Sequence, residues 1–321
     1  MNRRTLAIIT GCNGFTGRYL VSCLRESRGS FDILGMDIHD DPLWDVDIYV
    51  KSSLERQFTD TIRTDLENAE KILCFHLAGQ IFNQDVDRMR INNLTATRNT
   101  LLSLVPYREK TVVLNVGSSA EYGYQGKVKI TEDCTPEPVS RYGSCKLLQT
   151  QLARDTGHSC GLSVIATRTF NLIGPGQTDR LFCGNLARQI AAYKAREKDR
   201  ITVGDLSAYR DFLDVRDAVR AYLILVRRGR AGQMYNIASG RMVKTAEVLA
   251  MMIDMAGINP GVVHQDKAPG KQQVPYQQGC IEKIRKETGW AASYQLERSL
   301  MDMIEHERRS FTDASKEREG A

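Results

Sequence analysis

Short apolar runs alternate with longer amphipathic stretches along the first half of the chain. Five runs have the length and the bounding turn residues of buried strands: TLAIIT at 5–10, FDILGMD at 31–37, KILCFHLAG at 71–79, TVVLNVGSS at 111–119 and LSVIATRTFN at 162–171. The stretches between them have helical spacing, at 17–27, 54–66, 90–105 and 142–156. This alternation predicts an α/β fold, a parallel sheet with helices on both faces.

The pattern changes after residue 171. A GPGQ turn is followed by predicted helices at 185–196, 214–228, 245–256 and 297–309, a short strand at 201–205 and a polar, proline-bearing stretch at 257–280. We expect residues 1–170 to form a doubly wound domain, to which part of 211–240 returns. Residues 171–310 form mainly a smaller C-terminal α+β domain, and 311–321 a frayed tail.

Composition narrows the class of protein. The 321 residues are 42% hydrophobic and 26% charged, which is ordinary for a globular protein and excludes a disulfide miniprotein, a collagen-like repeat and a disordered chain. Lys and Arg number 44 against 39 Asp and Glu, a net charge of +5. The basic clusters are short, so they indicate a solvated face rather than a nucleic-acid site, with attraction to an anionic substrate as the alternative.

Cysteine spacing and the N-terminus bear on location. The eight cysteines are scattered, without a CxxC pair or zinc-like spacing, so we expect buried thiols and no metal site. No signal-peptide pattern precedes the first strand, and no apolar run reaches the roughly 18 residues of a membrane-spanning helix. These features predict a soluble, cytoplasmic protein with no membrane partner.

The first predicted strand ends in the glycine-rich loop TGCNGFTG at 10–17, and a predicted helix follows at once. Glycines at 11, 14 and 17 permit a sharp turn and close approach of a pyrophosphate, which the helix N-terminus attracts. The motif alone is a weak signal, but the strand before it and the helix after it fit a dinucleotide-binding Rossmann fold. A glycine turn without a ligand is the alternative.

Asp37 ends the second predicted strand, 20 residues after Gly17. A carboxylate there accepts hydrogen bonds from the adenosine ribose hydroxyls and repels a 2′-phosphate. We therefore expect NAD(H) to be favoured and NADP(H) to be the alternative, since Arg18 and His39 could weaken the preference. A surface turn acid is the other interpretation of Asp37.

Among the twelve tyrosines, Tyr142 alone has a lysine four residues later, Lys146. On a helix these residues share a face, and the ammonium is expected to lower the pKa of the phenol. Such a phenol exchanges protons with a substrate hydroxyl or carbonyl. An exposed Tyr–Lys pair on a surface helix is the alternative.

With these motifs in view, the chain resembles the extended short-chain dehydrogenases/reductases, the nucleotide-sugar epimerase/dehydratase group. The resemblance runs from the glycine loop almost to the C-terminus, and its further motifs are HLAG at 76–79, NNLTATRNTLL at 92–102, GSSAEYG at 117–123, PEPVSRYGSCK at 136–146, RTFNLIGPGQ at 168–177, YRDFLDVRDAV at 209–219 and YNIASG at 235–240. Within the group, FNLIGPGQ, VGDLSAYRDFLDVRD and the TGW at 288–290 are most similar to reductases of GDP-4-keto-6-deoxymannose.

The resemblance implies a role for each matching position. Ser118, Tyr142 and Lys146 would be catalytic: Ser118 would hydrogen-bond the substrate oxygen, Tyr142 would donate the proton and Lys146 would also bind the nicotinamide ribose. Asn93 would buttress the backbone. Cofactor contacts would come from Gly11, Asn13, Gly14, Phe15, Thr16, Gly17, Asp37, Leu77, Ala78, Gly79, Tyr142 and Lys146. The substrate set would be Ser118, Ser119, Asn171, Asn185, Arg210 and Lys271.

Asn171 and Arg210 match positions that bind the diphosphate in this group. A planar guanidinium suits phosphate oxygens. The alternative for Arg210 is a structural salt bridge to Asp211 or Asp214. The substrate arginine of the reductases is missing here, and Lys267 or Lys271 could replace it.

Two further positions depart from the group. The dehydratases carry an acid where this chain has Ala120, and Glu121 lies one residue too late, which on an extended segment faces the opposite side. Dehydration of the sugar is therefore not expected. The acid that follows the third strand near the adenine is replaced around Lys51, Ser52 and Ser53.

The leading hypothesis is NAD(P)H-dependent reduction of a nucleotide-bound 4-keto-6-deoxyhexose in deoxysugar biosynthesis. A nucleotide-sugar 4-epimerase with tightly held NAD⁺ is the alternative, followed by a 4,6-dehydratase and a non-catalytic NAD-binding protein. A homodimer is expected through the helices at 90–105 and 142–156, whose outer face carries Leu94, Leu101, Leu102, Leu147, Leu148 and Leu152.

Overall fold

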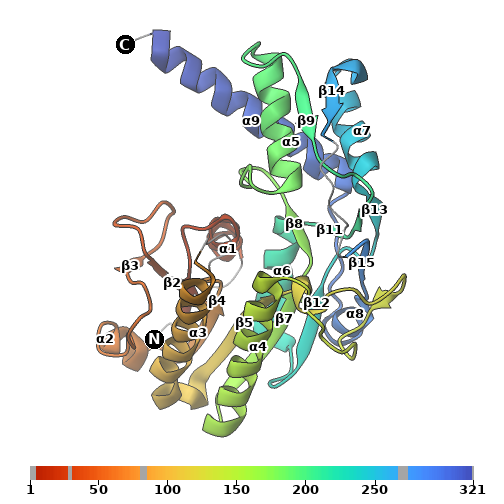
Figure 1. The fold of residues 1–321 in the computed structure, drawn as a ribbon. Helices are drawn as coiled ribbons and strands as arrows, with labels where there is room; N and C mark the ends of the chain where they lie inside the picture. The colour runs from red at the N-terminus through yellow and green to blue at the C-terminus, as the bar shows by residue number, and fades with distance from the viewer. Residues whose placement is uncertain (1–4, 28–30, 80–84, 267–273, 320–321) are drawn as a thin grey trace.

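A computed structural model describes residues 5–27, 31–79, 85–266 and 274–319. Within these ranges the main element is a parallel sheet with strand order β12-β7-β5-β4-β1-β2-β3 (Figure 1). Its strands are β1 (Thr5–Thr10), β2 (Phe31–Asp37), β3 (Ile48–Lys51), β4 (Lys71–His76), β5 (Thr111–Ser118), β7 (Ser163–Thr169) and β12 (Met234–Ile237). The strand order reverses between β1 and β4, and ligands bind at such a switch point. The predicted doubly wound Rossmann architecture is confirmed.

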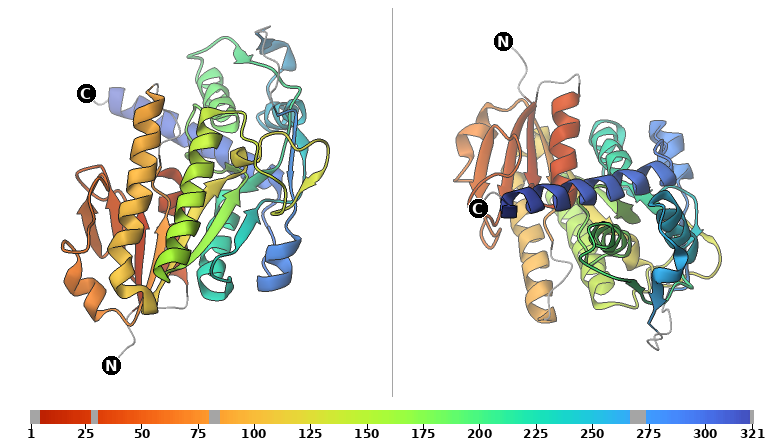
Figure 2. Two further views of the ribbon diagram at one scale, coloured as in Figure 1. Left: turned by 60° about the horizontal axis from the view of Figure 1, so that its bottom comes forward. Right: turned by 90° about the horizontal axis from the view of Figure 1, so that it is seen from above.

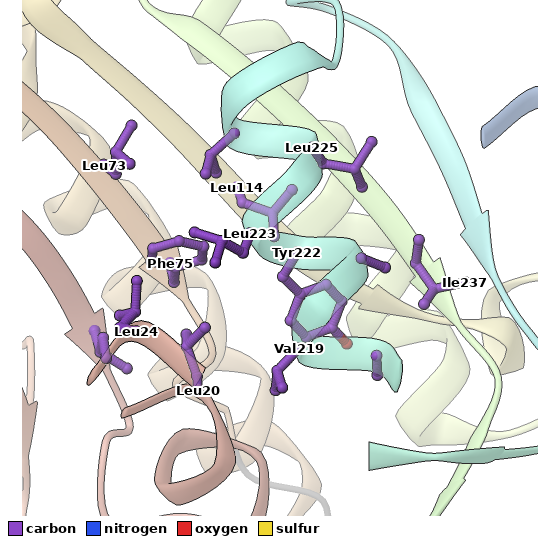
Figure 3. Packing of buried hydrophobic residues seen from close by; sticks show 14 of the residues in the cluster. Leu20, Leu24, Leu73, Phe75, Leu114, Val219, Tyr222, Leu223, Leu225 and Ile237 are labelled. Atoms are coloured by element: carbon purple, nitrogen blue, oxygen red, sulfur yellow. The ribbon is translucent and has the colours of Figure 1, made fainter. Parts of the chain in front are cut away.

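Helices cover both faces of this sheet (Figure 2). On one face lie α1 (Phe15–Glu26) and α6 (Val215–Arg228); on the other lie α2 (Arg63–Asn68), α3 (Val86–Leu104), η1 (Val105–Lys110) and α4 (Arg141–Cys160). Figure 3 shows the core beneath α1 and α6, where Leu20 and Leu24 approach Phe75 on the sheet. Tyr222 of α6 lies in the same core and is fully buried. Because strands and helices are apolar toward each other, this burial is the main force that holds the layers together.

The predicted helix over 54–66 is wrong for most of its length. Leu54, Phe58, Ile62 and Leu66 are buried with helix-like spacing, but only 63–68 are helical. Residue 54 has a positive φ of 58°, and its carbonyl accepts a hydrogen bond from Asn99 of α3 at 2.9 Å. Side chains of α3 thus replace the i−4 bonds of a helix, so an irregular segment buries the same apolar residues.

A second core forms in the C-terminal half. It lies among α5 (Phe182–Lys194), α7 (Thr245–Met255) and α9 (Leu296–Glu319), flanked by β9 (Ile201–Val203), η3 (Pro260–Val262) and β14 (Val263–Gln265). Figure 1 shows α9 running beside α5 and beyond it. This helix continues to Glu319, so residues 311–319 are helical where a frayed tail is expected. In the described ranges no helix, α9 included, is long and apolar enough to cross a membrane.

The chain returns twice from the second half to the first. Strand β12 pairs with β7, and α8 (Glu282–Thr288) brings Ile284 and Trp290 into the core under α6. The halves are joined by short strands that the sequence pattern does not reveal: β6 (Lys129–Ile130), β8 (Asn171–Ile173), β10 (Tyr209–Arg210), β11 (Phe212–Asp214), β13 (Val243–Lys244) and β15 (Tyr276–Gly279). These strands bring residues 171, 210 and 277 close to the carboxyl ends of the main sheet.

Candidate active site

A cavity of about 530 Å³ lies at the carboxyl ends of the sheet strands, next to residues of the second half. The structure brings many of the predicted site residues to its wall: Gly11, Gly14, Phe15, Thr16, Gly17, Leu77, Gly79, Ser118, Ser119, Tyr142, Lys146 and Asn171. Asn13, Asp37, Ala78, Asn185 and Arg210 are not among the lining residues. Lys267 and Lys271 lie outside the described residues.

The glycine loop packs its helix directly onto the end of β1. A Cβ atom on Gly17 would lie 2.4 Å from the carbonyl oxygen of Cys12 and 2.5 Å from that of Gly11, so this position accepts no side chain. The close packing aims the first N–H groups of α1 at the cavity, where they have no partner within the helix. This is the geometry of an anion site at a helix N-terminus.

Asp37 lies beside the same loop at the end of β2. Its Oδ2 accepts the Asn13 N–H at 3.0 Å, and its Oδ1 accepts the Ile38 N–H at 2.8 Å and contacts His39 Nδ1 at 2.7 Å. The Asn13 side chain, for which a cofactor contact is expected, instead holds the carbonyl of Asp41 and the N–H of Leu43. Each carboxylate oxygen retains lone-pair capacity for ribose hydroxyls.

A buried hydrogen-bond chain fixes the loop that follows β4. Thr97 donates to the Asn93 carbonyl at 2.8 Å, so it accepts from His76 Nε2 at 2.9 Å. Burial first, and the charge of Lys146 second, lower the pKa of His76 to about 3, so its Nδ1 is unprotonated and accepts from Thr10 at 2.8 Å. Thr10 accepts in turn from the N–H of residue 78 at 3.2 Å. Ala78 therefore supports the cavity wall from behind.

Tyr142, Lys146 and Ser118 converge as the sequence predicts. Helix α4 begins at the Ser140 cap, whose hydroxyl accepts the Gly143 N–H at 3.0 Å, and this start places Tyr142 at the cavity. Its phenol hydrogen-bonds Ser118 at the end of β5. One turn later, the Lys146 Nζ donates to the Val116 carbonyl at 2.9 Å and is almost fully buried.

The expected depression of the Tyr142 pKa is wrong in this structure. Burial raises the pKa of the phenol to about 12, and it outweighs the lowering effect of the hydrogen bond to Ser118. Burial also lowers the pKa of Lys146, which weakens its hold on a proton. The negative charge of Glu121 further raises the Tyr142 pKa. At neutral pH the phenol therefore carries its proton.

Glu121 is fully buried and points away from the cavity. Its Oε1 accepts from the Ser118 N–H at 2.9 Å and from the Thr150 hydroxyl at 3.0 Å, and its Oε2 accepts from Arg168 Nε at 2.9 Å. Residues 119–121 form the short helix η2 (Ser119–Glu121), so the expected extended segment is wrong, although the carboxylate does face away. A Cβ on Gly117 would lie 2.3 Å from Oε1, which explains the glycine there. Ala120 lines the cavity instead.

The predicted substrate residues separate into two groups. Ser119 and Asn171 line the cavity, whereas Asn185 is exposed and bonds the Asp179 carbonyl at 3.0 Å. Arg210 donates to the Tyr209 carbonyl at 2.9 Å, and burial lowers its pKa.

Arg210 faces the cavity side of its small sheet. It is in register with Gln277 of the neighbouring strand β15, which lines the cavity, so the two side chains share a face. The carboxylates offered as alternative partners are bonded elsewhere: Asp211 accepts from Ser239 at 2.6 Å, and Asp214 pairs with Arg216 at 2.7 Å.

Several lining residues escape sequence analysis. The lining residues for which no site role was predicted are Val116, Gly117, Thr169, Phe170, Leu172, Gln177, Thr178, Leu181, Tyr222 and Gln277. Tyr222 has the spacing of a core residue in its amphipathic helix, yet its hydroxyl bonds Thr169 at 2.8 Å. Gln277 stands in a polar stretch with no periodicity. Gly117, Thr169, Phe170, Leu172 and Gln177 lie within quoted motifs of the family, so their positions carried a readable signal although no role was predicted for them.

The residues present fit a nicotinamide dinucleotide. The glycine cradle lines the same cavity as Tyr142 and Lys146, and the carboxylate at the end of β2 is bonded to that cradle through the Asn13 N–H. Groups of three or more His, Cys, Asp or Glu side chains that could hold a metal are absent from the part of the chain that the structure describes. Fold and site together define an oxidoreductase of the short-chain dehydrogenase/reductase type.

Comparison with known proteins identifies the family within the short-chain dehydrogenases/reductases to which the chain belongs. The chain belongs to the NAD dependent epimerase/dehydratase family, whose model matches residues 7–238. It is 30% identical over 303 residues to a GDP-6-deoxy-D-mannose reductase from Pseudomonas aeruginosa, covering 92% of this chain and 95% of that protein. A UDP-glucose 4-epimerase from Azospirillum brasilense is 25% identical over 321 residues, covering 89% and 87%.

A solved structure agrees with this assignment. RMD from Pseudomonas aeruginosa, complexed with NADPH, superposes with a TM-score of 0.82 at 28% identity and covers 95% of this chain and 99% of that one. The family's relatives are nucleotide-sugar reductases and epimerases, and this chain is an NAD(P)-dependent member of it.

Replacing Tyr142 by Phe removes the hydroxyl for which a proton-donor role is predicted, but leaves the ring that lines the cavity. We expect turnover to fall by roughly 10²–10⁴, the usual effect of losing a general acid, with cofactor affinity nearly unchanged. Steady-state kinetics and a fluorescence titration of NADH measure the two quantities. Tyr294→Phe, on an exposed tyrosine, is the matched control and should retain full turnover. Near-full activity of the Tyr142 variant would remove this phenol from the mechanism.

Proposed function

We propose that the protein reduces the 4-keto group of a nucleotide-bound 6-deoxyhexose, as a GDP-4-keto-6-deoxymannose reductase would, in deoxysugar biosynthesis. The observation that carries the proposal is the convergence of Ser118, Tyr142 and Lys146 at the cavity that the glycine cradle also lines. The similarity to a GDP-6-deoxy-D-mannose reductase over almost the whole of both chains supports the choice of substrate.

In this reaction a bound nicotinamide cofactor supplies a hydride to the carbonyl carbon. Tyr142 gives its proton to the developing alkoxide, and Ser118 stabilises the same oxygen by a hydrogen bond. The phenolate left behind is stabilised by the Lys146 ammonium one helical turn away, which the Val116 carbonyl holds in place. A proton from solvent then restores the phenol.

The two halves of the chain bind different ligands. Residues 1–170, with the returning part of 211–240, hold the cofactor, and 171–310 supply most of the substrate contacts. Arg210 serves the diphosphate, because a guanidinium on the cavity side of its sheet binds phosphate oxygens bidentately. Binding of the diphosphate fixes the sugar at the cofactor and so lowers the entropic part of the barrier. The eight unpaired thiols favour a reducing cytoplasmic location.

The decisive experiment supplies GDP-4-keto-6-deoxymannose and NADH. We expect one NADH oxidised per sugar reduced, followed by absorbance and product NMR, and no water elimination from GDP-mannose. The second expectation follows from Ala120, which cannot transfer a proton where the dehydratases have an acid, while Glu121 is sequestered. Elimination of water from an unoxidised sugar would overturn the proposal.

A 4-epimerase is the second candidate, favoured by the UDP-glucose 4-epimerase among the relatives. It would use the same Ser118, Tyr142 and Lys146, and would regenerate its cofactor in each cycle. Sugar conversion without net NADH oxidation, in protein that retains NAD⁺ through purification, would assign this activity instead.

We propose that NADH is bound more tightly than NADPH, because a 2′-phosphate beside the Asp37 carboxylate is repelled. Dissociation constants from fluorescence titration should differ about tenfold. Asp37→Ser should bring the two values close together. Asp40→Ser is the control, because Asp40 is exposed and pairs with Lys51 on the next strand. Tighter binding of NADPH by the wild type would contradict this preference.

We propose a homodimer formed through α3 and α4. These helices lie side by side on one face of the sheet (Figure 2). Ile91 of α3 and Leu148 of α4 are 57% and 42% exposed. Leu101 does not contribute, since it is buried in the core beneath. Light scattering at micromolar concentration should give twice the mass of the 36.1 kDa chain, and Leu148→Glu should shift it toward the monomer. A monomeric wild type would refute the dimer.

A further inference from the structure

A row of hydroxyl side chains crosses the carboxyl ends of β5 and β7. Ser118 is in register with Thr169 on the neighbouring strand, so the two side chains stand on the same face of the sheet. Tyr142 of α4 hydrogen-bonds Ser118, and the hydroxyl of Tyr222, which belongs to α6, lies 2.8 Å from that of Thr169. All four residues line the cavity. The site therefore contains a second phenol, to which the proposed reaction gives no role.

Tyr222 is a polar side chain placed in an apolar core. It is fully buried and packs among the residues beneath α1 and α6 (Figure 3). Burial raises the pKa of its phenol and outweighs the lowering effect of the bond to Thr169, so the hydroxyl stays protonated at neutral pH. Burying a hydroxyl is costly unless it is hydrogen-bonded. A phenylalanine would fill the same space without that cost, so packing alone does not account for the hydroxyl.

The hydroxyls of Thr169 and Tyr222 have a hydrogen to spare. One of their two hydroxyl hydrogens makes the 2.8 Å bond, whichever oxygen donates it. The other hydrogen has at best the Thr167 hydroxyl, 3.5 Å from that of Thr169, as its acceptor among the described residues, and this distance is long for an O–H···O bond. Because Thr169 and Tyr222 both line the cavity, a ligand there can accept the spare hydrogen.

The strand order indicates which part of a dinucleotide meets this pair. The glycine cradle lies at the end of β1, and Asp37, the expected contact of the adenosine ribose, lies at the end of β2 on one side of it. Ser118 and Thr169 end β5 and β7 on the other side, two and three strands from β1, or roughly 10 and 14 Å at about 4.8 Å per strand. A dinucleotide bound across the cradle therefore brings its nicotinamide end to the pair.

We infer that Tyr222 is a positioning residue for the nicotinamide end of the cofactor, and that it acts by holding Thr169 at the cavity wall. The spare hydrogen of the two hydroxyls suits the carboxamide oxygen of the nicotinamide, which is a neutral acceptor. The inference rests on the dinucleotide site and not on the sugar that is reduced.

The test compares NADH with ADP-ribose, which contains the same adenosine and pyrophosphate but lacks the nicotinamide. Calorimetry on the intact protein gives both dissociation constants. Tyr222→Phe should weaken NADH by about 3- to 10-fold, the effect of one hydrogen bond, and leave ADP-ribose within about twofold. The fluorescence of bound NADH, which reports the surroundings of the nicotinamide ring, should change in the same variant.

Two further variants separate positioning from folding. Thr169→Val removes the other hydroxyl and keeps the shape of the side chain, so it should weaken NADH to a similar extent. Tyr235→Phe is the matched control. Tyr235 is equally buried and its hydroxyl bonds Glu287 at 2.6 Å, but it is not among the residues that line the cavity. This control should lose stability on heating and keep both dissociation constants.

The ratio of the two affinities decides the outcome. Unchanged NADH affinity in both Tyr222→Phe and Thr169→Val would remove the pair from cofactor binding. Equal weakening of NADH and ADP-ribose, or the same loss in Tyr235→Phe, would assign the effect to the fold and overturn the inference. If Tyr222→Phe does not fold, Thr169→Val decides alone. No sugar substrate enters these measurements, so their result is independent of the proposed reaction.

Discussion

The buried ion pair between Glu121 and Arg168 joins the segments that carry the chemistry. Its carboxylate lies at 0% exposure among β5, η2, α4 and β7, and it accepts hydrogen bonds from the Ser118 N–H, Thr150 and Arg168. Removing two charges from water is costly, and only a complete set of partners offsets that cost. Here both carboxylate oxygens are bonded, so the pair also determines where Ser118 stands.

The Glu121–Arg168 pair also constrains the residues packed around it. The carboxylate occupies the space of a side chain at Gly117, and the guanidinium lies 4.3 Å from the centroid of the Tyr122 ring. Tyr122 in turn bonds Asn236 of β12 at 2.7 Å, which ties the catalytic strand end to the returning chain. Glu121, the acid next to Ala120 in the sequence, therefore has a structural role, because both of its carboxylate oxygens are bonded within the protein. The phenol of Tyr142, which does line the cavity, is therefore the group to which we assign proton transfer in the proposed reaction.

Much of this arrangement was readable in the sequence, and the failures have physical causes. The glycine loop, the strands and the Tyr142–Lys146 pair follow from periodicity and local spacing, whereas Ser118 follows from the resemblance to the family. The segment 54–66 has helical periodicity, but Asn99 and Ser103 of α3 satisfy its backbone, and periodicity cannot report a partner distant in sequence.

The same limit explains why the sequence did not predict the residues that line the cavity from the second half of the chain. Strands of two to four residues carry no period, so the register that places Gln277 beside Asn171 has no sequence signature. The prediction of a lowered pKa for Tyr142 was wrong for another reason. The sequence shows the neighbouring lysine but not the burial that raises the pKa of the phenol. Strand pairing and the desolvation of a side chain are both properties of the assembled fold. They affect the predictions for the active site more than those for the hydrophobic core.

The raised pKa of Tyr142 also bears on the direction of the chemistry. Reduction of a ketone begins with the proton on the phenol, and this is the form that burial favours. Oxidation of an alcohol, the first step of an epimerase cycle, begins with the phenolate, which burial and the charge of Glu121 both disfavour. The Lys146 ammonium lies one helical turn away from Tyr142, and burial lowers the pKa of this lysine. The electrostatics of the protein groups thus favour the donor role, and an epimerase on this scaffold would need the positive charge of an oxidised cofactor to reverse that balance.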